Sequence, residues 1–222
     1  MVEASENLTT RGLHRGSGGA VRCSWCGDDP LYQRYHDREW GRPMGSDKRL
    51  FEKLSLEGFQ AGLSWLTILR KRENFRQAFA GFEIASVARF GAREVKRLLA
   101  DAGIVRHRGK IESTINNARR ALDLQTEFGS LGAFYWRFET PEAERPKTLS
   151  AEDIRALSQT EASRRLSKEL KRRGFSFVGP TTAYAFMQAM GLVNDHLEGC
   201  GVREEVEEAR RRFKRPTSSR PV

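Results

Sequence analysis

Cysteine and histidine residues lie in two short clusters near opposite ends of the chain, and this placement constrains the fold more than any other feature. The first cluster holds Cys23, Cys26 and His36, and the second holds His196 and Cys200. Thiolate and imidazole groups at such short spacings are typical of a tetrahedral Zn²⁺ site. Five candidates compete for four positions, so one of them is superfluous. Four protein ligands would make a closed, structural site that joins the chain ends; buried free cysteines with ordinary surface histidines are the alternative.

The composition limits the class of protein. With 222 residues, 38% of them hydrophobic, the chain suits one domain or two closely packed subdomains. No run of about 18 apolar residues is present, so we expect no membrane span. An odd number of cysteines, three, does not make a disulfide framework. We therefore expect a reducing, cytoplasmic compartment, in which clustered cysteines bind metal more often than they form disulfides.

Three segments are expected along the chain. Residues 1–20 are rich in Ser, Gly and Thr and lack the apolar core of a secretory signal, so we expect a disordered extension. Residues 21–202 form the expected folded domain. Residues 203–222 begin as a charged helix end and continue as a basic Pro/Ser/Arg tail, which we expect to be frayed.

The chain is strongly basic, with 39 Lys and Arg residues against 29 Asp and Glu and a formal net charge of +10. Cationic side chains set against phosphates release condensed counterions, so such an excess favours a polyanionic partner. We therefore expect a nucleic acid partner, and a merely basic protein without one is the alternative.

Helical periodicity dominates the middle of the chain and predicts an all-α fold. A first stripe places five residues on one helical face: Leu50, Leu54, Glu57, Ala61 and Trp65. Further helical patterns cover residues 84–102, 111–128, 151–157, 161–173 and 181–190. Strand-like alternation is nearly absent, and the clearest case, residues 175–178, lies between two glycines and indicates a hairpin.

This hairpin has the features of a phosphate-binding turn. A basic helix end at residues 168–173 precedes it, and Pro180 suits the first position of the helix that follows. The N–H groups of a helix N-terminus bind anions, and glycines allow a phosphate to approach the backbone closely. Gly174, Val178, Gly179 and Thr181 are the predicted DNA contacts, and a plain connection between two helices is the alternative. The basic turn at residues 106–110 is either a second phosphate contact or a solvated run of charge.

A carboxylate on the first apolar stripe is the third unusual feature. Glu57 is costly on such a face unless it is paired or functional. Several aromatic residues lie nearby in the sequence: Tyr32, Tyr35, Trp40, Phe59 and Trp65. Together they could form a slot that stacks a planar base while the carboxylate accepts hydrogen bonds from its edge. A salt-bridged glutamate beside an aromatic core is the alternative.

Twelve blocks of the sequence resemble the DNA-3-methyladenine glycosylase I family, in the same order along the chain. They are residues 22–23, 29–32, 35–37, 39–41, 56–65, 71–74, 101–104, 106–111, 171–175, 177–179, 186–189 and 191–196. The likeness spans about residues 22–200 and implies an all-α helix-hairpin-helix DNA glycosylase fold with a structural zinc site joining the N- and C-terminal segments. It also implies a partner, double-stranded alkylated DNA; a monomer is the default expectation.

The resemblance implies roles for individual residues. Cys23, His36, His196 and Cys200 match the zinc ligands of the family, which leaves Cys26 as the extra cysteine. Glu57 matches the carboxylate that hydrogen-bonds the methylated adenine, Trp65 the stacking aromatic, and Tyr32 and Tyr35 the tyrosines that line the pocket.

Two positions bear on the reaction type. Thr181 stands where relatives with lyase activity have a Schiff-base lysine, so we expect a monofunctional enzyme that leaves an abasic site. Asn194 stands where many relatives in the wider superfamily have a catalytic aspartate, although Asp195 follows it. Phe59 departs from the glutamine of the family, and we expect it to alter the shape of the pocket.

Two other functions remain in competition. A non-enzymatic zinc-dependent DNA-binding module would share the charge, the metal site and the hairpin, but it has no need for Glu57 among aromatics. A metal-dependent nuclease would need carboxylates gathered around an open metal site, and no dense Asp/Glu motif supplies them.

Overall fold

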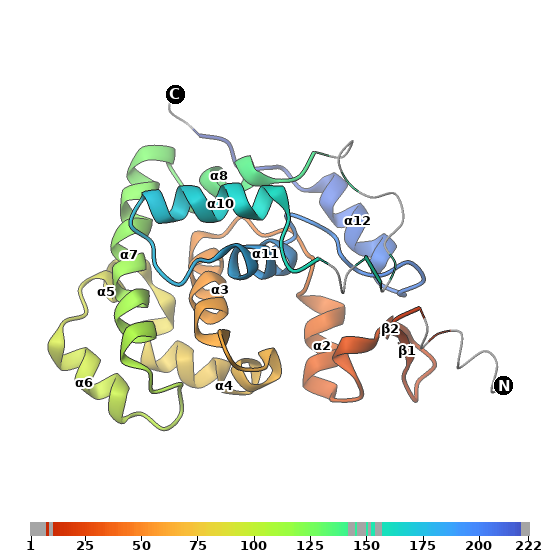
Figure 1. The fold of residues 1–222 in the computed structure, drawn as a ribbon, viewed down its shortest axis with the longest axis horizontal. Coiled ribbons are helices and arrows are strands. Elements are labelled where there is room, and N and C mark those ends of the chain that lie inside the picture. Colours follow the sequence, from red (N-terminus) through yellow and green to blue (C-terminus); the bar gives the residue numbers. More distant parts are fainter. Residues whose placement is uncertain are drawn as a thin grey trace.

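The protein is built almost entirely of helices packed around one long core (Figure 1). The computed structural model describes residues 8, 11–141, 145, 150, 152–153 and 157–218. Its α-helices are α2 (Pro30–Arg38), α3 (Asp47–Gln60), α4 (Trp65–Ala78), α5 (Ile84–Ala88), α6 (Ala92–Ala100), α7 (Arg108–Phe128), α8 (Leu131–Tyr135), α10 (Glu161–Arg172), α11 (Pro180–Ala189) and α12 (Arg203–Arg212). Three 3₁₀ helices join them, η1 (Ser24–Cys26), η2 (Ala80–Phe82) and η3 (Trp136–Phe138). None of the helices in the described part is long and apolar enough to cross a membrane.

Helix α3 lies at the centre of the molecule, where it packs against α4, α7, α8 and α11 (Figure 1). Every residue from Leu50 to Phe59 is buried, including the charged ones. A helix that is buried on all sides must pair the polar side chains that it carries. The surrounding helices α7, α10 and α11 confirm the helical patterns of residues 111–128, 161–173 and 181–190.

The stripe from Leu50 to Trp65 is not one helix. Helix α3 ends at Gln60, Gly62 adopts a positive φ of 81°, and the Ser64 side chain accepts a hydrogen bond from the N–H of Thr67 to cap α4. Glycine is the residue that adopts this left-handed conformation without strain. The prediction of a shared helical face for Glu57 and Trp65 is therefore wrong, because a turn separates them.

The pattern at residues 84–102 is also divided. Helix α5 ends at Ala88 and α6 begins at Ala92, with Gly91 as its N-cap. Glu94 accepts a hydrogen bond from the Gly91 N–H, which fixes this new helix start. Most of the pattern at residues 151–157 lies outside the described residues.

The start of the described chain is a small antiparallel hairpin rather than a disordered extension. Strand β1 (Leu13–Arg15) pairs with β2 (Val21–Cys23), with Leu13 opposite Cys23. Leu13 is buried against Cys23, Leu197 and Cys200, which supplies the apolar contact that holds the hairpin. The prediction of disorder is wrong for residues 11–20, because strands of three residues carry too little alternation to be recognised.

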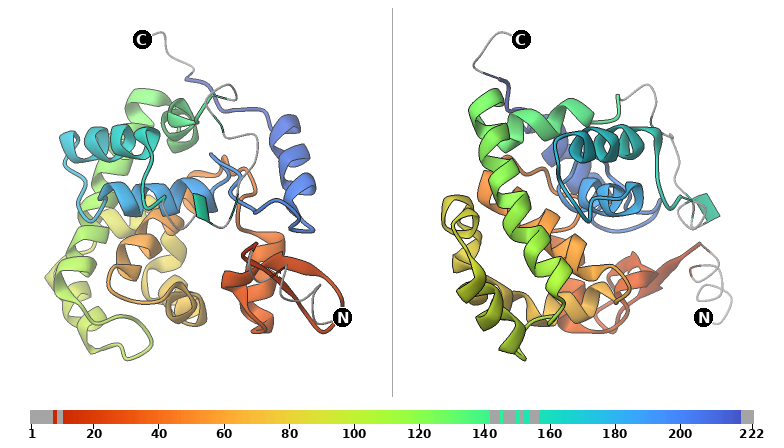
Figure 2. Two further views of the ribbon diagram at one scale, coloured as in Figure 1. Left: turned by 45° about the vertical axis from the view of Figure 1, so that its right-hand side comes forward. Right: turned by 60° about the vertical axis from the view of Figure 1, so that its left-hand side comes forward.

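The last described segment is also part of the packed body. Helix α12 buries Val206 and Arg210, and the chain beyond it places Phe213 against Trp136 and Arg215 against Glu139. The expected frayed tail is therefore wrong for residues 213–216. Helix α12 lies on the same side of the molecule as the hairpin and α2 (Figures 1 and 2), so the two ends of the fold meet.

Candidate active site and metal centre

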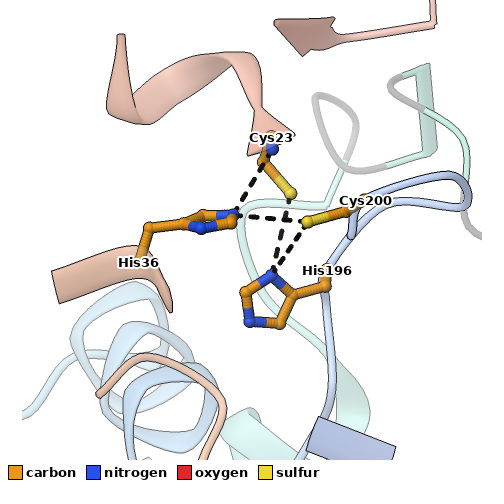
Figure 3. Close-up of side chains that lie close together, drawn as sticks. All are labelled: Cys23, His36, His196 and Cys200. Carbon is orange, nitrogen blue, oxygen red and sulfur yellow. Dashed lines mark hydrogen bonds between the residues drawn. The ribbon is translucent and has the colours of Figure 1, made fainter. Parts of the chain in front are cut away.

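Four buried side chains from the two ends of the chain meet at one point (Figure 3). Cys23, His36, His196 and Cys200 each aim one ligand atom at a common centre, and these atoms all lie within 4.8 Å of one another. Cys200 Sγ lies 3.5 Å from both His36 Nε2 and His196 Nδ1, and Cys23 Sγ lies 3.9 Å from His196 Nδ1. In a tetrahedral zinc site with bonds of about 2.0–2.3 Å, neighbouring ligand atoms are about 3.3–3.8 Å apart. The donor set and its spacing therefore fit a tetrahedral metal ion.

The free nitrogen of each histidine is also held. Asp37 Oδ1 lies 2.8 Å from His36 Nδ1, and the carbonyl oxygen of Trp40 lies 3.2 Å from His196 Nε2. Such partners fix the ring orientation, so that His36 Nε2 and His196 Nδ1 face the common centre. Arg22 binds the same Asp37 carboxylate through its Nε and NH2 atoms. These contacts fix the orientation of both histidine rings.

Cys26 lies outside this group. Its Sγ donates a hydrogen bond to the Cys23 carbonyl oxygen at 3.2 Å, and burial raises the pKa of the Cys26 thiol to about 12. Cys26 Sγ is therefore turned toward the backbone and is not among the four converging ligand atoms.

A cavity of about 320 Å³ opens beside the four-residue cluster. Aromatic side chains form much of its wall: Trp25, Tyr32, Tyr35, Trp40 and Trp65. Polar groups reach it at four positions: Glu57, Gln60, Gln188 and Asp195. Apolar walls with a few converging polar groups are typical of a small-molecule site. Of the five aromatic residues expected at this site, only Phe59 is absent from the lining.

Phe59 lies in the core. Its ring packs 4.6 Å from Phe75 and 5.7 Å from Phe79, measured between centroids, and its side chain is fully buried. The expectation that Phe59 alters the pocket is therefore wrong, because Gln60 and not Phe59 faces the cavity.

The cavity and the four-residue cluster share a wall. The Trp25 ring lies 5.2 Å from the His36 ring and 5.0 Å from the Tyr32 ring, and the Trp40 ring lies 4.6 Å from the His196 ring. Trp25 stands between Cys23 and Cys26 in the sequence. The sequence singles out the two cysteines, and Trp25 is not among the expected site residues, although it is one of the chain's four tryptophans.

Glu57 projects from the buried last turns of α3 and is only 5% exposed. Its Oε1 atom forms an ion pair with Lys53 Nζ, one helical turn earlier, at 2.8 Å. The expected carboxylate therefore faces the cavity and is also salt-bridged. Lys53 is absent from the residues expected at the site, although a Lys–Glu pair four positions apart on a helix is a recognisable signal.

Two neutral phenols complete this side of the cavity. Burial raises the pKa of Tyr32 to about 12, and burial also raises the pKa of Tyr35 well above its ordinary value. Both side chains therefore keep their protons at neutral pH and offer uncharged hydrogen-bonding groups.

Trp65 is the first residue of α4 and reaches the cavity across the turn at Gly62. Its indole N–H is buried and has no hydrogen-bond partner among the described residues. A buried unsatisfied donor is costly, so it is available to an acceptor on a bound ligand.

Of the neighbouring residues Asn194 and Asp195, only Asp195 lines the cavity. The Asn194 amide donates to Glu207 and to the Arg203 carbonyl oxygen, away from the cavity lining. Asp195 lines the cavity, accepts hydrogen bonds from the Tyr184 hydroxyl and the Gln188 amide, and has a pKa raised by burial.

The segment between α10 and α11 is a tight turn without strand pairing in the described residues. Helix α7 holds it: the Asn117 side chain accepts from the Ser176 N–H at 3.0 Å and donates to the Ser176 carbonyl oxygen at 2.9 Å. Gly174 adopts a positive φ of 82°, and Gly179 is the N-cap of α11. Space around Gly179 is open, since a Cβ there would meet nothing within 4 Å.

The other predicted contacts of this turn differ in exposure. Thr181 is exposed, whereas the Val178 side chain is buried and its carbonyl oxygen accepts a hydrogen bond from Ser167. Only backbone atoms of Val178 can therefore face a ligand. Arg172 and Arg173 are both paired with Glu169, so the helix end is less basic than its sequence.

Lys110, in the basic turn at residues 106–110, is not a solvated charge. It is buried, and its ammonium group donates to the carbonyl oxygens of Phe59 and Ala61 at the end of α3. Lys110 therefore stabilises the turn between α3 and α4.

Comparison with known proteins places this arrangement in a family. The family model described as methyladenine glycosylase matches residues 25–204. DNA-3-methyladenine glycosylase 1 of Escherichia coli (strain K12) is 50% identical over 181 residues, which cover 81% of this chain and 95% of that protein. The chain belongs to the methyladenine glycosylase family.

The solved structures agree with this assignment. A crystal structure of 3-methyladenine DNA glycosylase I matches with a TM-score of 0.75 and 48% identity, covering 81% of this chain and 98% of that one. A structure of the glycosylase from Staphylococcus aureus, described as showing the basis of 3-methyladenine recognition, matches with a TM-score of 0.75 and 38% identity over 82% and 96% of the two chains. The helical fold is therefore that of the methyladenine glycosylases.

Proposed function

We propose that this methyladenine glycosylase hydrolyses the N-glycosidic bond of 3-methyladenine in alkylated double-stranded DNA and leaves an abasic site. The observation that carries the proposal is the cavity that brings Glu57 together with Trp65, Tyr32 and Tyr35. A base that is flipped out of the helix needs such a slot, with aromatic faces to stack on and polar groups along its edge.

The charge of the damaged base explains the need for a carboxylate. Methylation at N3 makes the adenine cationic, so its glycosidic bond is weak and the departing base needs no proton. Glu57 attracts this positive charge and accepts hydrogen bonds from the base, which selects it over neutral adenine. Trp65 supplies stacking, worth about 1–3 kcal/mol per base. Its buried indole N–H is a further donor to the base.

The chain is suited to water as the nucleophile rather than an amine. No lysine occurs from Gly174 to Cys200, and Thr181 is the exposed residue at the start of α11. Without an amine at this place, no Schiff base forms with the sugar and the backbone stays intact.

Cys23, His36, His196 and Cys200 are the proposed ligands of one structural Zn²⁺. The bound ion would stabilise the junction of the chain ends and supply no chemistry to the base, because four protein ligands leave no open position. These residues also support the cavity, since Trp25 and Trp40 pack on the two histidines.

The turn between α10 and α11 is the proposed contact with the DNA backbone, through Gly174, Gly179, Thr181 and the main chain of Val178. A phosphate can approach the open side of Gly179 and the N-terminus of α11. Two large apolar side chains remain exposed in the described chain, Leu63 (42%) and Phe177 (41%). Such residues fill the gap that a flipped nucleotide leaves. We expect a monomer acting on duplex DNA in the cytoplasm.

One assay separates this function from its competitors. Purified protein incubated with methylated duplex DNA should release free 3-methyladenine and leave the strands unbroken. A DNA-binding module would release nothing, and a nuclease would cut the backbone. Borohydride should trap no covalent protein–DNA adduct, and an adduct would overturn the monofunctional mechanism.

A further inference from the structure

Lys53 is a buried cation in contact with the base site. It lies on α3 and is only 5% exposed. Its Nζ atom lies 2.8 Å from Glu57 Oε1, donates to the Tyr35 hydroxyl at 2.8 Å, and lies 3.2 Å from the centroid of the Trp65 ring. An ammonium group has three N–H donors. All three have a partner here: a carboxylate, a phenol and an aromatic face.

These three partners are themselves proposed to bind the base. Lys53 therefore fixes the relative positions of Glu57, Tyr35 and Trp65, which come from three different helices. It also makes the same two kinds of contact that a cationic base would make, an ion pair with Glu57 and a cation–π contact with Trp65.

The charge on Lys53 offsets that of Glu57. At 2.8 Å the ammonium group cancels much of the field that the carboxylate projects into the cavity. Burial lowers the pKa of Lys53 to about 8. The Glu57 and Glu39 carboxylates oppose this lowering of the pKa, whereas Arg72 adds to it. Asp195 faces the base cavity beyond Glu57. Lys53 itself lines a second cavity, together with further charged groups: Arg38, Arg42, Arg49 and Glu52.

We propose that Lys53 is a positioning and specificity-determining residue that holds Glu57 and Trp65 in place and favours departure of the base by opposing its positive charge. This inference rests on the proposed function of Glu57 and Trp65 as the base site.

The reaction explains why opposition to the positive charge helps. When the C1′–N9 bond breaks, its electron pair moves to N9, the base becomes neutral 3-methyladenine, and the positive charge passes to the sugar. Water then adds to C1′ and releases a proton to solvent. A cation beside the base destabilises the charged substrate more than the nearly neutral leaving group, so it lowers the barrier to bond cleavage.

Single-turnover excision by Lys53→Met tests this inference, because methionine keeps the length of the side chain and removes the charge. We expect the maximal rate to fall about tenfold while the DNA concentration for half-maximal rate also falls, by about threefold, because Glu57 then attracts the cationic base unopposed. A residue with a purely structural role would lower the rate and raise that concentration together, and this result would overturn the inference.

Lys110→Met is the matched control. Lys110 is also buried and also contacts the end of α3, but its ammonium group binds the carbonyl oxygens of Phe59 and Ala61, neither of which lines the cavity, instead of cavity-lining side chains. We expect Lys110→Met to lower the melting temperature without lowering the DNA concentration for half-maximal rate. A fall in both the maximal rate and that concentration in both variants would refute a specific role for Lys53.

The pH dependence of the unaltered enzyme gives a second test that does not require the variant to fold. Protonated Lys53 promotes departure of the base, so the single-turnover rate should fall as the pH rises through about 8, the pKa of Lys53. A flat profile between about pH 7 and 9 would contradict the inference. Where Lys53→Met folds, its profile should be flat in this range.

Glu57→Gln tests the assignment of the base site separately from the role of Lys53. Full activity of a folded Glu57→Gln variant would show that the base site itself is misassigned. If Glu57→Gln is impaired, and Lys53→Met has a lower maximal rate and a higher half-saturating DNA concentration, the base site stands and only the role of Lys53 is rejected.

Discussion

Replacing one proposed metal ligand tests how the two ends of the chain are joined. Cys200→Ser removes a thiolate from the cluster, whereas Cys26→Ser removes a buried thiol that lies outside it. The pair is matched, because both substitutions exchange a buried sulfur for oxygen. We expect one zinc per chain in the unaltered protein and in Cys26→Ser, and loss of stoichiometric zinc in Cys200→Ser.

The expected loss of stability follows from the length of the loop that the metal closes. His36 and Cys200 are 164 residues apart in the sequence. Cross-linking a loop of this length lowers the conformational entropy of the unfolded chain and so raises its free energy by about 5 kcal/mol. This value applies the relation used for disulfides to the metal bridge. For a protein of this size, each kcal/mol corresponds to about 2–4 °C in melting temperature. Cys200→Ser should therefore melt about 10–20 °C lower than the unaltered protein.

The cavity should respond as well, because Trp25 and Trp40 pack on the metal-cluster histidines. Titration with free 3-methyladenine should show weaker binding to Cys200→Ser and nearly unchanged binding to Cys26→Ser. Elemental analysis and thermal melts on the same samples complete the assay. Zinc retained by Cys200→Ser and lost from Cys26→Ser would refute the assignment of ligands, and no zinc in the unaltered protein would refute the metal site.

Two further substitutions separate base binding from DNA binding. Trp65→Ala should weaken binding of free 3-methyladenine by about tenfold or more, because stacking is lost, and fluorescence titration measures this; unchanged affinity would remove Trp65 from the site. Asn117→Ala should weaken duplex binding several-fold while free-base binding stays the same, because it releases Ser176 in the turn between α10 and α11. An electrophoretic mobility assay measures this, and equal duplex affinity would show that the turn does not contact DNA.

The sequence predicts that these Cys and His side chains converge, for a physical reason. Only a few residue types bind zinc, and this chain has three cysteines and four histidines from which to choose. Spacing alone leaves Cys26 as an alternative ligand, and the resemblance removes it. The structure agrees, because the Cys26 thiol turns back to the Cys23 carbonyl oxygen.

Glu57 and Trp65 line one cavity, but not by the route that the sequence predicts. Periodicity places them on one helix, but Gly62 breaks that helix, and the turn brings Trp65 back to the same cavity. Periodicity alone cannot locate such a break, since Ala61 and Trp65 continue the apolar pattern.

The burial of Lys53 and the place of Trp25 could not be predicted from the residues alone. A lysine in an amphipathic helix is most often solvent-exposed, and the burial of Lys53 depends on how α2 and α4 pack against α3. The same holds for the hairpin at residues 13–23, whose stability depends on Leu197 and Cys200 at the other end of the chain.

The most direct test of the account is excision of 3-methyladenine by Glu57→Gln. The substitution keeps the shape of the side chain and removes the negative charge that is proposed to select the cationic base. Loss of a hydrogen bond to a charged partner costs about 1.5–3 kcal/mol, so the excision rate at subsaturating DNA should fall by about one to two orders of magnitude while duplex affinity and melting temperature remain close to those of the unaltered protein. An unchanged rate in a well-folded Glu57→Gln variant would show that the carboxylate is only structural and does not select the methylated base.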